Sequence, residues 1–282
     1  MHNESLYRIG AAVMVLLLMV GWEIAAPKRK LTTAKAGRWT TNLSIIALDN
    51  LLVMFLIPFT VIQISLAAEA GNWGLFNQLN LPTVPTIILS VLALDMVIYL
   101  QHLMFHAVPL FWRLHMVHHA DLDIDVTTGL RFHPLEILIS IFIKMAAVAA
   151  LGPPMTAVLI FEIMLNATSM FNHSNIELPT GIDRWLRLLV VTPDMHRVHH
   201  SVIIRETNSN FGFNFPWWDR LFGTYRPQPA KGHLKMTIGL SQYRNHVDLS
   251  LGKVLLLPIT GNPGSYSLSS QGKEPVNLGN NQ

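Results

Sequence analysis

The chain contains no cysteine and few charged residues. The absence of cysteine among 282 residues excludes disulfides, thiolate zinc sites, iron–sulfur clusters and a catalytic cysteine. Charged residues make up 13% of the sequence and hydrophobic residues 51%, whereas soluble domains carry about 25% charge. The net charge of +3 does not indicate a nucleic acid partner. The composition therefore predicts a protein that is partly covered by lipid.

Five apolar stretches are long enough to cross a bilayer, whose core of ~30 Å needs roughly 20 helical residues. They cover residues 9–26, 43–68, 84–100, 134–151 and 154–171. The first stretch could be a signal peptide, but its basic cluster, Lys28 to Lys30, follows the apolar run, so we expect a retained span. The last two stretches either cross fully or form a re-entrant hairpin around Gly152-Pro153. We therefore expect an all-α membrane bundle of four or five apolar segments.

The placement of Lys and Arg predicts how the bundle is oriented. Basic residues from Lys28 to Arg38 lie between the first two stretches, which favours a cytoplasmic position for that loop. The 69–83 connection has no Lys or Arg, so it should lie on the opposite side. The number of spans then places the end of the third stretch in the cytoplasm. It places the chain from residue 172 onward on the same side.

Two charged residues interrupt the last two stretches. Lys144 and Glu162 are each nine residues from Pro153, so a turn at Pro153 would bring them to the same depth. Charges in a bilayer usually pair or face a cavity. We expect an ion pair across the hairpin; the alternative is that each side chain reaches water separately.

Histidine is the most unusual feature that is present. Ten of the 13 histidines lie between positions 102 and 200. They form one HxxxH motif, two HxxHH motifs and two single residues: His102 and His106; His115, His118 and His119; His196, His199 and His200; and His133 and His173. Residues i, i+3 and i+4 share a helix face, so the three motifs can direct eight imidazoles at one spot. Because a zinc enzyme usually uses three protein ligands plus water, this number indicates two metal ions with open positions. A single histidine such as His133 or His173 is also often just a hydrogen-bonded polar residue.

Several carboxylates and one tyrosine are candidates for supporting these histidines. A metal-bound histidine usually donates its second N–H to a carboxylate or a carbonyl. Asp95 lies seven residues before His102, and Tyr99 lies between them on the same helical face. Asp194 and Asp219 are further candidates. The alternative for Asp95 is a polar residue near a helix end at the interface.

The missing motifs narrow the chemistry. There is no HExxH of a zinc protease, no ExxH of a carboxylate di-iron bundle and no GxSxG of a serine hydrolase. A metal transporter would place its ligands near the bilayer midplane, whereas these histidines follow the ends of the stretches. An oxidative enzyme and a non-redox membrane zinc protein, either a hydrolase or a metal sensor, remain.

The histidine motifs and their neighbours resemble the fatty acid hydroxylase/sterol desaturase superfamily. The resemblance covers about residues 92–226 and is closest to a bacterial sterol desaturase branch that is similar to alkylglycerol monooxygenase. It rests on Asp95, Tyr99 and the HxxxH motif, on Pro109-Leu-Phe-Trp-Arg-Leu-His115-Met-Val-His118-His119, on Arg131-Phe-His133-Pro-Leu-Glu136, on Asn172-His173, on Pro193-Asp194-Met-His196-Arg-Val-His199-His200 and on Trp218-Asp219-Arg-Leu-Phe-Gly-Thr224. Leu103 departs from the pattern, because relatives commonly carry Arg after the first histidine.

The resemblance implies a membrane enzyme with two iron ions, which zinc can replace on purification, and O2 as co-substrate. It implies that the eight motif histidines and His173 are metal ligands, and that His133 is a ligand or supports one. It also implies hydroxylation, or as a second choice desaturation, of a membrane lipid, sterol or fatty-acyl or alkyl substrate. No flavin, haem or dinucleotide-binding motif is present, so a separate electron donor is expected.

From these inferences we expect a membrane region over residues 1–91, a catalytic domain over 92–226 and a C-terminal cytoplasmic extension over 227–282, with 262–282 disordered. We also expect the protein to reside in a bacterial inner membrane, with its histidines on the cytoplasmic side.

Overall fold

The computed structural model describes residues 2–270, which fold into helices joined by loops and contain no β-strand. The long helices are α1 (His2–Ala25), α2 (Lys35–Leu56), α3 (Val61–Ala70), α5 (Thr83–Ala107), α6 (Pro109–His119), α7 (Pro134–Leu151), α8 (Met155–His173) and α14 (Leu251–Thr260). The short helices are α4 (Leu75–Gln78), η1 (Val126–Leu130), α9 (Thr180–Leu186), α10 (Pro193–His199), α11 (Ile204–Thr207), α12 (Trp217–Leu221), α13 (Gly232–Lys235), η2 (His246–Leu249) and η3 (Leu268–Ser270).

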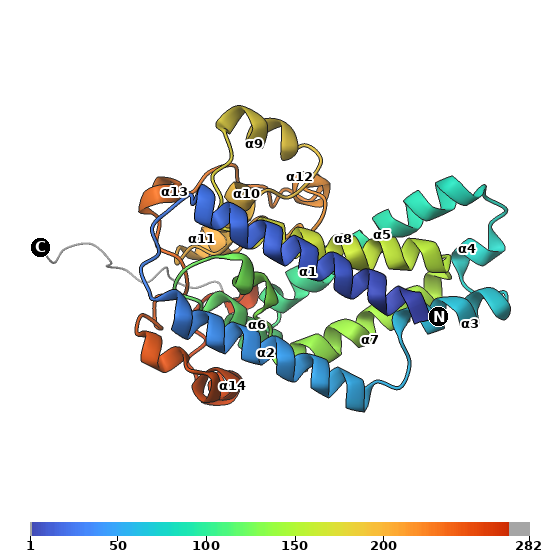
Figure 1. The fold of residues 1–282 in the computed structure, drawn as a ribbon, viewed down its shortest axis with the longest axis horizontal. Coiled ribbons are helices and arrows are strands. Elements are labelled where there is room, and N and C mark those ends of the chain that lie inside the picture. Colours follow the sequence, from blue (N-terminus) through green and yellow to red (C-terminus); the bar gives the residue numbers. More distant parts are fainter. Residues whose placement is uncertain (1, 271–282) are drawn as a thin grey trace, which may run out of the picture.

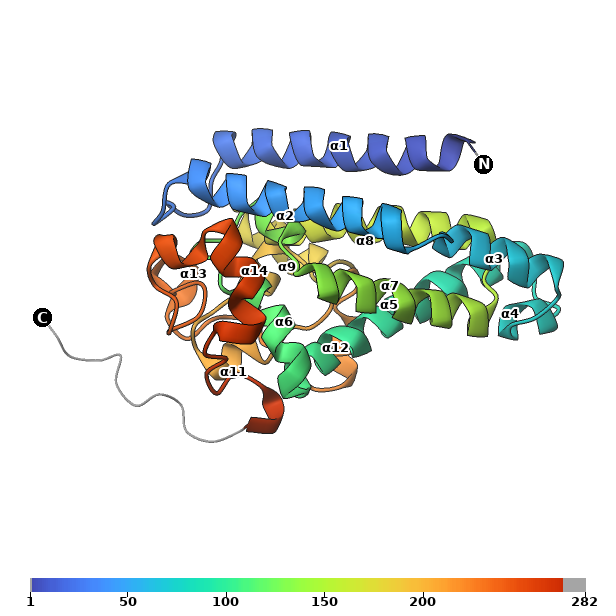
Figure 2. The ribbon, with the colours of Figure 1, turned by 90° about the horizontal axis from the view of Figure 1, so that it is seen from below.

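The helices α1, α2, α5, α7 and α8 run side by side along the long axis of the molecule (Figures 1 and 2). α8 packs against α1 and α5, and α7 packs against α3, α5 and α2. Five helical segments of the described residues are long and apolar enough to cross a membrane, which confirms the expected all-helical membrane fold. Apart from α4, which lies beside α3 at the opposite end, the short helices gather with α14 at one end of this bundle (Figure 1).

The second apolar stretch does not form one helix. α2 already begins at Lys35 and ends at Leu56, and α3 starts at Val61. Pro58 lies between them; it cannot donate a backbone hydrogen bond and disfavours a helical residue before it. Thr60 then starts α3 with a capping box, in which its hydroxyl accepts from the backbone N–H of Gln63 and its own N–H donates to the Gln63 side chain.

The basic loop after α1 lies at the same end of the bundle as the short helices. The Lys28 N–H donates to the Asn175 carbonyl at 2.9 Å, and the Arg29 guanidinium donates to the carbonyls of His233 and Met236. This agrees with the span count, which places the loop and the chain after residue 172 on one side. The assignment of that side to the cytoplasm stays a prediction.

The expected ion pair between α7 and α8 is present. Lys144 Nζ lies 3.8 Å from Glu162 Oε1, and the Glu162 side chain is 4% exposed. The hairpin formed by α7 and α8 turns at Gly152, whose φ of 58° lies in the left-handed region that glycine tolerates. This turn places the two residues at the same depth.

A buried arginine joins α2 to the loop that follows α6. Arg38 is 7% exposed, and its guanidinium donates to the carboxylates of Asp121 and Asp125, each at 2.6 Å. Burial alone would raise the pKa of Asp121, but the adjacent Arg38 holds this pKa well below its ordinary value. Arg131, fully buried nearby, donates to the side chain of Asn42 on α2 at 2.8 Å.

Part of the expected disordered tail is folded. Tyr266 is 1% exposed, stacks on Trp112 with ring centroids 5.7 Å apart and donates its hydroxyl to the Val202 carbonyl. The Trp112 indole donates in turn to the Pro263 carbonyl. The composition of 262–282 is polar and therefore indicated disorder, but the buried ring of Tyr266 holds residues 262–270 against the fold. The rest of the expected tail, 271–282, lies outside the described residues.

We predict that Arg38→Met lowers the thermal stability of the protein in detergent. The substitution leaves two buried carboxylates without their cation, which costs about 3–5 kcal/mol. The apparent melting temperature measures the effect, with Lys30→Met on the exposed loop as the control. Equal melting temperatures for the two variants would show that this ion pair network does not stabilise the fold.

Candidate metal centre

Nine buried histidines gather at the end of the bundle into two groups that could each hold a metal ion. Within each group, one nitrogen from every ring lies within 4.8 Å of the others. The first group, site A, comprises His102, His106, His115, His119 and His199. The second group, site B, comprises His118, His173, His196 and His200. None of the nine side chains is more than 3% exposed.

Helix geometry explains how the motifs divide between the two sites. The α5 pair is one turn apart at the end of that helix, and both residues face site A. In α6, His115 and His119 are four residues apart and face site A, while His118 faces site B. In α10 the arrangement is reversed: His196 and His200 face site B, and His199 faces site A. Each HxxHH motif therefore serves both sites, rather than one spot as expected from a shared helix face.

Hydrogen bonds fix the orientation of six of these rings through the Nδ1 atom. Four partners are backbone carbonyls: Phe211 for His102 at 2.8 Å, Arg131 for His118 at 3.2 Å, Ser169 for His173 at 2.7 Å and Ser209 for His199 at 2.7 Å. Two are side chains: Glu136 for His115 at 2.6 Å and Asn208 for His106 at 3.0 Å. A carbonyl oxygen only accepts, so Nδ1 carries the proton and Nε2 of the neutral ring presents a lone pair.

The lone pairs face one another. His118 Nε2 lies 3.1 Å from His173 Nε2, although each ring has its proton on Nδ1. His102 Nε2 and His115 Nε2 are 3.2 Å apart in the same way. Two lone pairs at this distance repel unless a cation lies between them. Two imidazole nitrogens bound to one ion at ~2.1 Å are roughly 3.0–3.4 Å apart at common coordination angles, so the residues fit a metal.

Protonation of the rings cannot replace the metal near neutral pH. Burial lowers the pKa of His115 to about 3. Burial together with neighbouring histidines holds the pKa values of His119 and His199 well below their ordinary value. In site A, the Nε2 atoms of His106, His119 and His199 are also buried without a hydrogen-bond partner among the described residues. Neutral imidazoles with free Nε2 atoms are the form that binds metal.

Comparison with known proteins agrees with this arrangement. Residues 87–224, which carry all nine histidines, match the family described as fatty acid hydroxylase. This match spans 138 of the 282 residues, so this region of the chain is similar to the fatty acid hydroxylase family. No solved structure matches the chain.

Several curated proteins with known names are similar to this chain. Ornithine lipid hydroxylase OlsE of Rhizobium tropici is 29% identical over 54% of this chain and 45% of the relative. Alkylglycerol monooxygenase of Danio rerio is 31% identical over 60% of this chain and 37% of the relative. Cholesterol 25-hydroxylase of Rattus norvegicus is 28% identical over 52% of this chain and 49% of the relative. The chain therefore spans about half the length, or less, of these three relatives.

His133 lies outside both sites. It precedes α7, where its Nδ1 accepts from the Leu135 N–H and its Nε2 is 3.2 Å from the Leu255 carbonyl. Both ring nitrogens are thus engaged by the protein, and the structure does not bring His133 into either group, so its expected role as a ligand or as the support of one stays a prediction. In the structure, the sequence Arg-x-His-Pro-x-Glu uses its histidine to cap α7.

Asp95 and Tyr99 do not contact the histidines, contrary to expectation. Asp95 accepts from the Asn214 side chain and the Trp218 indole, each at 2.8 Å. The Tyr99 hydroxyl is 2.9 Å from the Thr224 hydroxyl. Both residues share a helix face with His102, but the segment around Phe211 lies against that face and supplies the carbonyl that the imidazole needs.

The two other expected partners also act at a distance from the rings. Asp219 accepts from the N–H groups of Phe211 and Gly212, each at 2.8 Å, so it holds the segment whose carbonyl orients His102. Burial raises the pKa of Asp219 to about 6. Asp194 is paired with Arg197 and lies 3.4 Å from Lys28, so it fastens α10 to the loop after α1.

Glu136 and Asn208 are direct partners of the histidines that were not predicted from the sequence. Glu136 stands out in the sequence as the single acidic residue of the apolar stretch 134–151, and in the structure it is 4% exposed. Asn208 and the four backbone carbonyls do not stand out in this way, since their positions depend on how the loops fold.

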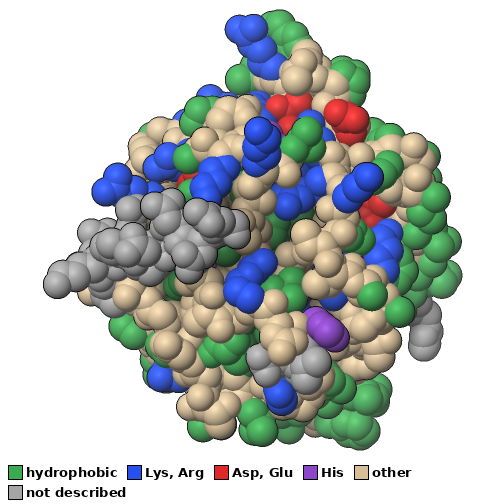
Figure 3. All heavy atoms as spheres, turned by 90° about the vertical axis from the view of Figure 1, so that its left-hand side faces the viewer, with side chains coloured by type: hydrophobic (Ala, Val, Ile, Leu, Met, Phe, Trp, Pro, Cys, Tyr) green, Lys and Arg blue, Asp and Glu red, His purple; other side chains and the backbone are tan. Residues whose placement is uncertain are grey.

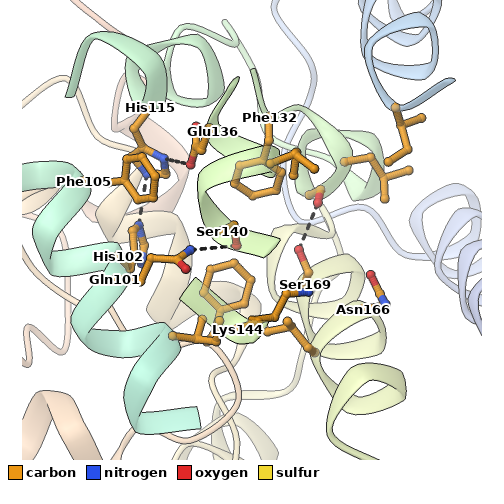
Figure 4. A pocket seen from close by; sticks show the side chains of 17 residues that line it. Gln101, His102, Phe105, His115, Phe132, Glu136, Ser140, Lys144, Asn166 and Ser169 are labelled. Atoms are coloured by element: carbon orange, nitrogen blue, oxygen red, sulfur yellow. Dashed lines mark hydrogen bonds and ion pairs between the residues drawn. The ribbon is translucent and has the colours of Figure 1, made fainter. Parts of the chain in front are cut away.

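A cavity of about 160 Å³ reaches site A from the membrane-spanning part of the bundle. Its walls come from α2, α5, α6, α7 and α8 together with η1, and they include His102 and His115 (Figure 4). Three aromatic rings, Phe105, Phe132 and Phe213, surround this end of the cavity. An apolar molecule from the bilayer would thus meet the imidazoles of site A without passing through water.

We predict that Glu136→Ala weakens metal binding by about 10–100-fold, because the carboxylate that orients the His115 ring is lost. Titration of the metal-loaded protein with a chelator measures the change. Glu69→Ala, exposed on α3, is the matched control. An unchanged metal affinity in Glu136→Ala would mean that His115 is not a ligand.

Proposed function

We propose that the protein is an O2-dependent oxidoreductase that hydroxylates a membrane lipid, using two iron ions held at sites A and B. The observation that carries this proposal is the pair of buried imidazole groups, of which site A forms part of the wall of a cavity within the membrane-spanning bundle. The similarity to enzymes named as lipid hydroxylases and monooxygenases supports it.

Iron is the metal that the family resemblance implies for these sites. Imidazole suits iron, zinc, copper and nickel, but oxidation of an unactivated C–H bond needs a redox-active metal, which no side chain replaces. When bound, the iron pair supplies the activation of O2. Overall, the substrate C–H, O2, two electrons and two protons give the C–OH product and water; desaturation is the second possible outcome.

The residues of this chain hold, orient and shield the reactants. Nine imidazoles would bind the ions, and the backbone carbonyls, Glu136 and Asn208 that accept from Nδ1 set the tautomer of six of these rings. The three phenylalanines at the inner end of the cavity exclude water and restrict the position of one substrate carbon. Because the sequence contains no motif for an organic redox cofactor, a separate partner supplies the electrons.

The surface at the histidine-bearing end supports a cytoplasmic orientation. Lys and Arg side chains are distributed across this end and outnumber Asp and Glu there (Figure 3). We therefore propose that this end faces the cytoplasm of a bacterial inner membrane, where the electron donor would bind.

We predict that His118→Ala abolishes lipid oxidation and that His133→Ala leaves most of it. Both variants remove one buried or nearly buried imidazole, but only His118 belongs to a metal site. The assay incubates the reduced protein with a bacterial lipid extract under ¹⁸O2 and detects labelled lipid by mass spectrometry. Full activity in His118→Ala, or unlabelled products in the unmodified protein, would contradict the proposal.

A further inference from the structure

The cavity at site A extends away from the metal ligands along one face of α7. Glu136, Ser140 and Lys144, spaced by four residues, all line it (Figure 4). Four-residue spacing keeps side chains on one helix face, and the rise of ~1.5 Å per residue puts Lys144 about 12 Å from Glu136 along the axis. A hydrocarbon tail alone needs no ammonium group at this position.

Lys144 belongs to a cluster of two cations around one carboxylate. Its Nζ is 3.8 Å from Glu162 Oε1, and Arg8 Nη1 on α1 is 3.3 Å from Glu162 Oε2. The Lys144 and Glu162 side chains are 16% and 4% exposed. At 3.8 Å the ammonium is beyond hydrogen-bond distance of the carboxylate, so its donors are not fully used. The two cations and one carboxylate leave one surplus positive charge; Lys144 and Glu162 lie inside the bundle, and the Arg8 side chain is 35% exposed.

The two cations face two adjoining cavities. Lys144 lines the cavity that reaches site A, and Arg8 lines a second cavity of about 450 Å³ between α1, α2 and α8. Ile46, Leu130 and Asn166 line both. α1 packs mainly on α8, whereas α2 packs on α7 and η1, so the second cavity lies where α1 and α2 separate (Figure 2). The adjoining cavities lead from the lipid-facing side towards the imidazoles.

Charges within a membrane-spanning bundle are costly and often mark the path of a substrate. We propose that Lys144 and Arg8 bind an anionic group, a carboxylate or a phosphate, of the lipid that this protein oxidises. Glu162 keeps the two cations apart and in place when no lipid is bound. That this lipid is the substrate rests on the proposed function; the anion site itself does not.

The site also fixes where the lipid is oxidised. With its anionic group at Lys144, a chain extends towards site A, and the carbon that reaches His102 and His115 lies about 12 Å from the anion. The oxidised position is therefore counted from the polar end of the lipid and does not move when the tail is lengthened.

Binding of a fluorescent fatty acid tests the anion site directly. The probe is cis-parinaric acid, compared with its uncharged methyl ester, on zinc-loaded full-length protein in phosphatidylcholine nanodiscs without O2. We expect the acid to bind at least about tenfold more tightly than the ester. Lys144→Met should remove this preference while keeping ester binding, and Glu162→Gln should strengthen acid binding. The exposed Lys231→Met is the matched control.

Equal affinities for acid and ester in the unmodified protein, or a preference that survives in Lys144→Met, would overturn the proposal. Loss of ester binding in Lys144→Met would indicate a damaged cavity. In that case Arg8→Met and Glu162→Gln test the proposal, because Arg8→Met should weaken acid binding and Glu162→Gln should strengthen it. If both leave the preference unchanged, the proposal is wrong.

Competition identifies the source of the anion. Palmitic acid and lysophosphatidic acid carry a carboxylate and a phosphate, and the one that displaces the probe at lower concentration indicates the headgroup. Since this assay uses redox-inactive zinc and no O2, it can succeed if the oxygenase proposal fails and fail if that proposal succeeds.

Discussion

The structure depends on one electrostatic constraint: nine neutral imidazoles converge in a buried interior, and in each group two of them direct their Nε2 lone pairs at one another. His118 and His173 show it most clearly, because backbone carbonyls hold their protons on Nδ1 while their Nε2 atoms are 3.1 Å apart. Without a cation this arrangement is repulsive and leaves buried nitrogens unsatisfied. Two metal ions would turn the same contacts into bonds, so we infer that folding of this end is coupled to metal binding.

The rest of the fold serves that constraint. The ends of α5 and α8 carry histidines of the membrane bundle into the sites, and α6 and α10 each contribute histidines to both sites. Loops supply the carbonyls that orient the rings, and Asp219 and Asp95 in turn hold the loop around Phe211. The Arg38 network fixes the segment between α6 and η1 against α2. Buried polar contacts thus position the sites, while apolar helices provide the route for lipid.

The local patterns predicted the helices, the histidine-rich segments and the Lys144–Glu162 pair, because each depends on spacing along one helix or one hairpin. They did not predict how HxxHH divides between two sites, since this depends on what packs on either side of α6 and α10. The carbonyl of Phe211 displaced Asp95 as the partner of His102, and the cap of α7 engaged His133. Tyr266 likewise ordered a segment whose composition indicated disorder. Tertiary contacts decided all four cases.

The central claim is that each histidine group holds one metal ion. Anomalous diffraction at the iron edge, from crystals of anaerobically prepared protein, tests it most directly. The account predicts two iron peaks, one among His102, His106, His115, His119 and His199 and one among His118, His173, His196 and His200. A single peak, or iron bound away from these rings, would contradict it.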